Sequence, residues 1–224
     1  MTTPISFPAA RLAFWTAAMF LIILVSLHFI KPGIDPSWNF ISEYQVGAFG
    51  WLMSVAFFML AMSCVFLVVA LWKYLRSVVG MIGMLMLLLT AGGMLTAAFN
   101  PADPINTRPE LVTPEGELHQ LGAMLDQVPF AAILLTIVLI RKYAYWKSHR
   151  KTLIGATFLV CAGLIVFIAS MTIYMPADGV FGPHTPFGWP NRLMISVQAV
   201  WLMVMARIAI RDNAIKEENA VSAL

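Results

Sequence analysis

Phe99–Gln127 reads FNPADPINTRPELVTPEGELHQLGAMLDQ and is the longest polar interruption in an otherwise apolar chain. It concentrates ionisable side chains, and the apolar runs on both sides of it are too long for an ordinary globular core. A helix that crosses a bilayer needs about 20 mostly apolar residues. We therefore interpret the rest of the chain as a scaffold of membrane helices that holds this stretch at one membrane face.

The composition of the chain points to the same class of protein. Of the 224 residues, 60% are hydrophobic and 11% are charged, whereas soluble domains are about half apolar and a quarter charged. The net charge of +3 is small and is explained by a basic surplus on one side of a membrane, so no nucleic-acid partner is expected. Cys64 and Cys161 both lie in apolar runs, which argues against a disulfide or a cysteine metal site.

Six stretches are long and apolar enough to span a membrane. They cover residues 12–30, 49–72, 77–99, 119–140, 152–174 and 191–210. A short interfacial helix is expected after the first span, because Asp35 and Pro36 resemble a helix start and Gly47 a helix end. The predicted fold class is all-α: one polytopic domain over residues 1–224, a six-transmembrane-helix bundle whose tail begins at residue 211.

The loop charges predict the orientation of this bundle. Lys and Arg concentrate near the N-terminus, in the second and fourth connections and in the tail, which marks these parts as cytoplasmic. We therefore expect a multi-pass protein of the cell membrane with both termini in the cytoplasm. His28, His119 and His184 then lie at the outer face together with most of the acidic residues.

The fourth span carries a carboxylate within its apolar length. It is expected to begin at Thr113 and Pro114, a cap followed by proline. His119 and Asp126 are seven residues apart, so both point to one helix face, with Asp126 about 10 Å deeper. An acid at that depth faces a polar cavity or a partner. The alternative interpretation is an interhelical hydrogen bond without chemistry.

Arg192 opens the sixth span within the motif WPNR. A cation is unfavourable there for both the helix dipole and the positive-inside rule. Its expected partners are Glu43, Asp103, Asp178 or an anionic ligand, since a guanidinium suits carboxylates and phosphates. The alternative is an arginine that snorkels to the headgroup layer.

Four short motifs carry a family resemblance: SEY after the first span, FNPADP at the end of the third, ELHQ in the fourth and PNR in the sixth. In this order and spacing they resemble a six-span bacterial and archaeal membrane family catalogued as domain of unknown function 998. The resemblance covers nearly the whole chain and implies a fold without an established activity. It directs attention to Ser42, Glu43, Asp103, His119, Asn191 and Arg192, to which the residues themselves add His28, Asp126 and His184.

The first functional hypothesis is a binding protein. In it, an outward-facing polar pocket binds a lipid or other small amphiphile, with transport as an extension. The ligand-binding residues would be Ser42, Asp103, Asn191 and Arg192, and Glu43, Asp103 and Arg192 could instead form a salt-bridged lid.

The second hypothesis is a zinc-dependent hydrolase that acts on a lipid at the outer leaflet. His28, His119 and His184 would be the metal ligands, and Glu43 and Asp126 the catalytic carboxylates. In outline this set resembles the seven-span ceramidase and progestin-receptor-like superfamily, but the chain has six spans and neither Ser-x-x-x-His nor His-x-x-x-His. A haem held by two histidines is a weaker alternative, because no two histidines lie deep on facing spans.

Overall fold

The computed structural model describes residues 6–177, 179 and 181–221. Its elements are α1 (Ser6–Ile30), η1 (Ile41–Gln45), α2 (Trp51–Leu71), η2 (Trp72–Tyr74), α3 (Val78–Phe99), η3 (Pro109–Leu111), α4 (Pro114–Met124), α5 (Val128–Lys142), α6 (Ala144–Ser148), α7 (Arg150–Tyr174) and α8 (Gly188–Val221). Six helical stretches of the described chain are long and apolar enough to cross a membrane: Ser6–Ile30, Trp51–Tyr74, Val78–Phe99, Pro114–Lys142, Arg150–Tyr174 and Gly188–Ile215. The predicted fold class, an all-α six-helix membrane bundle, is confirmed.

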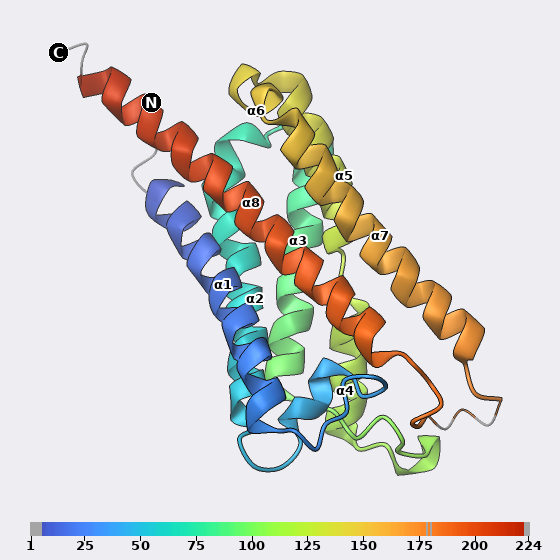
Figure 1. Ribbon diagram of the computed structural model, residues 1–224. Helices are drawn as coiled ribbons and strands as arrows, with labels where there is room; N and C mark the ends of the chain where they lie inside the picture. Colours follow the sequence, from blue (N-terminus) through green and yellow to red (C-terminus); the bar gives the residue numbers. More distant parts are fainter. Residues whose placement is uncertain (1–5, 178, 180, 222–224) are drawn as a thin grey trace.

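The helices form a bundle in which the start of α1 and the end of α8 lie at the same end (Figure 1). α2 packs against α1 and α3, α8 against α1 and α7, and α3 against α4 and α5. The opposite end carries η1, the connection 100–113 and the start of α4, and we call it the η1 end. Large apolar side chains remain exposed along the bundle, among them Trp15 on α1 and Phe158 on α7, as expected for a surface in contact with lipid.

Two helix boundaries differ from those expected from the sequence. α8 continues through the position where the tail was predicted to begin, because its polar residues find partners on η2. The hydroxyl of Tyr74 donates to Asp212, and the ammonium of Lys73 donates to Asn213 Oδ1 at 3.1 Å.

The interfacial helix is also shorter than predicted. Asp35 caps a turn, in which its Oδ1 accepts hydrogen bonds from the Ser37 amide and hydroxyl, and η1 is a single 3₁₀ segment. Gly47, at φ +74°, lies just beyond η1, as the sequence indicated. Tyr44, within η1, is fully buried.

The fourth span is broken in its middle, whereas the sequence was interpreted as one continuous helix. α4 ends at Met124 and α5 begins at Val128. Pro129 lacks an amide hydrogen, and its ring would clash with the carbonyl four residues earlier in a continuous helix. At the break, the amide of Gln127 donates to Thr90 Oγ1 at 2.8 Å and the amide of Val128 to Asp126 Oδ1 at 3.1 Å. These side chains satisfy backbone groups that lipid would leave unpaired.

Two glycines bring α3 and α4 into close contact. A Cβ on Gly93 would lie 2.2 Å from the carbonyl oxygen of Gly122, and a Cβ on Gly122 would lie 2.6 Å from the carbonyl oxygen of Gly93. Small residues at a membrane helix interface allow backbones to approach in this way. The neighbouring Gly92 has nothing within 4 Å of the same position and faces open space.

The pair Gly93→Ala and Gly92→Ala tests this packing. We expect Gly93→Ala to lower the free energy of unfolding by about 1–3 kcal/mol through overpacking. Gly92→Ala should be neutral or stabilising by about 0.5–1 kcal/mol, since alanine favours the helix. Unfolding midpoints of the two variants in the same detergent measure the difference, and equal midpoints would contradict the close approach.

Candidate functional site

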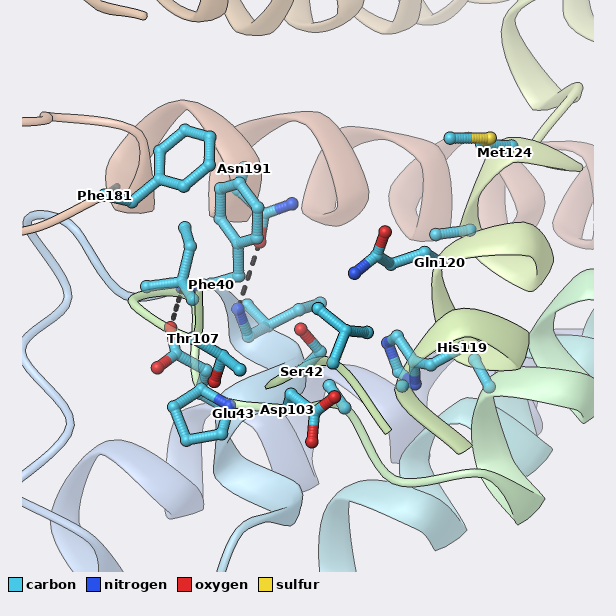
Figure 2. Close-up of a pocket in the computed structure, with 18 of the residues that line it drawn as sticks. Phe40, Ser42, Glu43, Asp103, Thr107, His119, Gln120, Met124, Phe181 and Asn191 are labelled. Atoms are coloured by element: carbon cyan, nitrogen blue, oxygen red, sulfur yellow. Dashed lines mark hydrogen bonds between the residues drawn. The ribbon is translucent and has the colours of Figure 1, made fainter. Parts of the chain in front are cut away.

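A cavity of about 610 Å³ opens at the η1 end. It is enclosed by η1, the connection after α3, the α4–α5 break, α7 and α8, and Figure 2 shows several of its side chains converging. The polar lining consists of Ser42, Glu43, Asp103, Thr107, His119, Gln120, Asp126 and Asn191. Most of the remaining lining is apolar, including Phe57, Met94, Phe167, Met171, Phe181 and Met194. Met124 lines the cavity and is 74% exposed, so the cavity opens to the surface beside α4.

Arg192 is buried behind this cavity and is bonded to neutral groups. Its guanidinium donates to the carbonyl oxygens of Asn39 at 2.6 Å, Gly188 at 3.1 Å and Pro36 at 3.4 Å. It also donates to the Tyr44 hydroxyl at 3.2 Å and to His28 Nε2 at 3.0 Å. These bonds hold the turn before η1 against the start of α8.

The expected counter-ions of Arg192 are bonded elsewhere. Glu43 and Asp103 each have their own donors, and Asp178 lies outside the described residues. Among the described residues, Arg192 thus makes no hydrogen bond to Glu43 or Asp103, and it is not one of the residues that line the cavity.

His28 is committed to Arg192. Its Nδ1 lies 2.8 Å from the Leu24 carbonyl oxygen, so this nitrogen donates, and Nε2 accepts from the guanidinium. Both ring nitrogens therefore have partners in the neutral tautomer.

Glu43 is buried and fixes η1 to its surroundings. Its Oε1 accepts from the Phe40 amide at 3.0 Å and its Oε2 from the Asn39 side chain at 2.9 Å. Burial raises the pKa of Glu43, and hydrogen bonds from Ile105, Asn39 and Phe40 oppose this shift in part. The carboxyl group thus favours its protonated form more in the folded protein than in the unfolded chain.

Asp103 ties the connection after α3 to the start of α4. Its Oδ2 accepts from the Thr113 amide at 2.8 Å, and its Oδ1 from the Thr113 hydroxyl at 3.1 Å. Thr113 in turn caps α4 by accepting from the Gly116 amide at 3.0 Å, as predicted. A Cβ on Gly116 would lie 2.0 Å from the Asp103 carboxylate, so this arrangement requires glycine.

His119 presents a ring nitrogen to the cavity. Its Nδ1 lies 2.9 Å from the Asn100 carbonyl oxygen and donates to it, and the ring packs edge-on against Phe57. Nε2 is then the acceptor nitrogen of this residue, which lines the cavity.

Asp126 forms the floor of the cavity at the α4–α5 break. The Gln198 side chain donates to its Oδ2 at 2.7 Å. Gln198 is fully buried, and its Oε1 has no hydrogen-bond partner. Thr90, beside the break, lies nine residues before the end of α3, roughly 14 Å along the helix axis. The floor is therefore near the middle of a hydrocarbon layer of about 30 Å.

The cavity brings together most of the residues selected from the sequence. Ser42, Glu43, Asp103, His119, Asp126 and Asn191 all line it, and Asn191 Oδ1 also accepts from the Ile41 amide at 3.1 Å. The three proposed zinc ligands are not brought together: His28 contacts Arg192, His119 lines the cavity and His184 is exposed. Among the described residues, no group of three or more His, Cys, Asp or Glu could hold a metal ion.

Two glutamines were missed by the sequence interpretation. Gln198 is a polar residue within the sixth apolar run, a signal that was available. Gln45 links three elements, since its side-chain amide donates to Ala97 O at 2.9 Å and to Ser54 Oγ at 3.0 Å, and its oxygen accepts from the Ala102 amide.

Arg192→Gln should destabilise the protein because it leaves several buried carbonyl oxygens without donors. We expect the free energy of unfolding to fall by about 2–4 kcal/mol. The exposed Arg108, at the same end of the bundle, gives the control Arg108→Gln, with an expected change within about 0.5 kcal/mol. Thermal unfolding in detergent measures both variants. Equal stability of the two would mean that Arg192 does not hold η1 against α8.

The burial of Glu43 predicts a trend of stability with pH. Since the folded-state pKa is raised, the stability contribution of the protonated form is complete below the ordinary pKa of 4.5 and is lost as pH rises through the folded value. We expect the melting temperature of the wild type, relative to Glu43→Gln, to fall as pH rises from 4.5 towards neutrality. Glu110→Gln, at an exposed position, controls for the loss of one carboxylate. If the melting temperature of the wild type relative to Glu43→Gln instead rises with pH, the pKa of Glu43 is not raised in the folded protein.

Comparison with known proteins identifies the family. The model of the family described as protein of unknown function DUF998 matches residues 14–208, which include all six spans in whole or in large part. No curated protein and no solved structure matches the chain. With the order of its motifs and its six-helix bundle, the chain belongs to the DUF998 family of membrane proteins.

Proposed function

We propose that this protein binds a small amphiphile in the cavity at the η1 end. The polar group of the ligand lies against the polar lining from η1, α4 and α8, and its apolar body lies against Phe57, Met94 and Met171. The observation that carries the proposal is the two-sided lining of a cavity of about 610 Å³ that opens beside α4.

The size and chemistry of the cavity suit such a ligand. Sites for small molecules are typically about 300–1,000 Å³, mostly apolar, with a few placed polar groups. Methionine side chains are flexible and adapt to irregular apolar shapes. Met124 and Met171, on α4 and α7, lie where an alkyl chain would pass between the cavity and the bilayer.

The orientation of the cavity follows from the loop charges. Lys73, Arg76 and the basic cluster Arg141–Lys151 all lie in connections at the end opposite η1. The positive-inside rule then places both termini in the cytoplasm and the cavity towards the outer leaflet. The ligand is thus an amphiphile of that leaflet or of the medium outside.

Binding is the step that the transport and hydrolysis hypotheses share. The α4–α5 break favours the hypothesis that the bound ligand is transported. In transporters, helices broken near the midplane supply backbone and side-chain groups that bind the substrate. The zinc hydrolase has less support, since His28 and His184 lie away from the cavity lining.

Filling the cavity tests the proposal. Ala123→Trp places an indole in the cavity, whereas Leu121→Trp places the same group on the lipid-facing side of the same helix. Native mass spectrometry of protein released from its own membranes should show one bound small molecule in the wild type and in Leu121→Trp. We expect at least about a tenfold lower bound fraction in Ala123→Trp, equivalent to about 1.4 kcal/mol.

Two results would contradict the proposal. One is a wild-type protein that carries no small molecule from its membrane. The other is an equal bound fraction in Ala123→Trp and Leu121→Trp, which would place the molecule outside the cavity.

A further inference from the structure

The cavity has an acidic lining with no basic side chain to balance it. Its ionisable residues are Glu43, Asp103, His119 and Asp126, and none of the described lining residues is Lys or Arg. The nearest buried cation, Arg192, directs its donors to His28, Tyr44 and backbone carbonyls on the other side of η1. The charge of Arg192 still acts on Glu43, so it is near Asp103 and Asp126 that the lining favours positive charge.

The three carboxylates differ in how they are held. Glu43 and Asp103 are built into the wall, where backbone amides donate to them and fix η1 and the start of α4. Asp126 also accepts from a backbone amide, that of Val128, but it stands at the floor, near the middle of the membrane, where a carboxylate is costly unless it meets a partner. Of these three, Asp126 is the one placed to serve a bound ligand.

A second observation at the floor indicates a missing donor. The Gln198 side chain is fully buried, with Nε2 bonded to Asp126 and Oε1 without a hydrogen-bond partner. This amide orientation holds while Asp126 is ionised, because an ionised carboxylate only accepts. Gln198 lies one turn beyond Met194 and Ile195, which line the cavity. Gln198 is not itself a lining residue, and its amide lies behind Asp126. Where Asp126 is ionised, this place combines a negative charge with an unsatisfied acceptor, and a group that carries both positive charge and N–H donors would satisfy them together.

We infer that the ligand is a cationic amphiphile, an alkylammonium with an apolar body, and that Asp126 and Gln198 bind its ammonium group. This inference rests on the proposed binding function and specifies the ligand class. The ammonium donates to Asp126 and to Gln198 Oε1, and the alkyl body extends past Met194 and Met171 towards the opening beside α4. An anionic headgroup is disfavoured in this cavity by the acidic groups of Asp103 and Asp126.

A series of probes with one chain and different head groups tests the inference. The protein is reconstituted in phosphatidylcholine nanodiscs, and saturable binding of radiolabelled dodecylamine is measured after subtraction of empty discs. Dodecyltrimethylammonium, dodecanol and dodecanoate are then added as competitors. We expect dodecylamine to bind at least about tenfold more tightly than dodecanol or dodecanoate, with dodecyltrimethylammonium between them because it lacks N–H donors.

Asp126→Asn and a matched control variant test whether Asp126 is the counter-ion of the bound ammonium group. Asp126→Asn should weaken dodecylamine binding by about tenfold or more while dodecanol binding is retained, which also shows that the variant is folded. Glu117→Gln removes an exposed carboxylate of α4 at the same end outside the cavity lining, and it should change dodecylamine binding by less than about twofold.

The outcomes separate the inference from the proposed function. If dodecanol or dodecanoate competes as well as dodecylamine, or if Asp126→Asn binds dodecylamine like the wild type, the cationic ligand is overturned while amphiphile binding stands. If no probe binds saturably and no small molecule is retained from the native membrane, both fail. If Asp126→Asn does not fold, the wild-type probe series alone decides.

Discussion

The guanidinium of Arg192 holds the part of the fold on which the cavity depends. It bridges the carbonyls of Pro36 and Asn39, before η1, to the first turn of α8. The approach is so close that a Cβ on Gly188 would lie 2.3 Å from the Pro36 oxygen. Because all these partners are neutral, the arginine stabilises η1 without pairing with a cavity carboxylate.

The break between α4 and α5 supplies the other half of the site. Pro129 prevents a continuous helix, and Asp126 bonds to an amide at the break with one oxygen and to Gln198 with the other. A polar group thereby reaches mid-membrane depth at the floor of an otherwise apolar space. Arg192 and the break act on different walls of the cavity, so substitutions at the two places should have nearly independent effects on stability.

The helical architecture was easier to predict from the sequence than the contacts between individual residues were. Long apolar runs and helix caps depend on neighbouring residues, so the six spans and the Thr113 cap were predictable. The break between α4 and α5 could have been predicted from Pro129. It was not predicted because the apolar run continues through this proline. The backbone partners of Arg192 were not predicted because charge pairing was expected, whereas the fold presents carbonyl oxygens from residues far away in the chain. Whether three histidines meet depends likewise on tertiary packing, which no spacing encodes.

A bound alkylammonium located in the membrane protein would test the central claim most directly. Crystals grown in a lipid mesophase with 12-bromododecylamine would place the bromine by its anomalous signal and the amine by its density. The account predicts the ammonium against Asp126 and Gln198 and the bromine towards the opening beside Met124. Bromine found only among the surrounding lipids, with no density at Asp126, would contradict it.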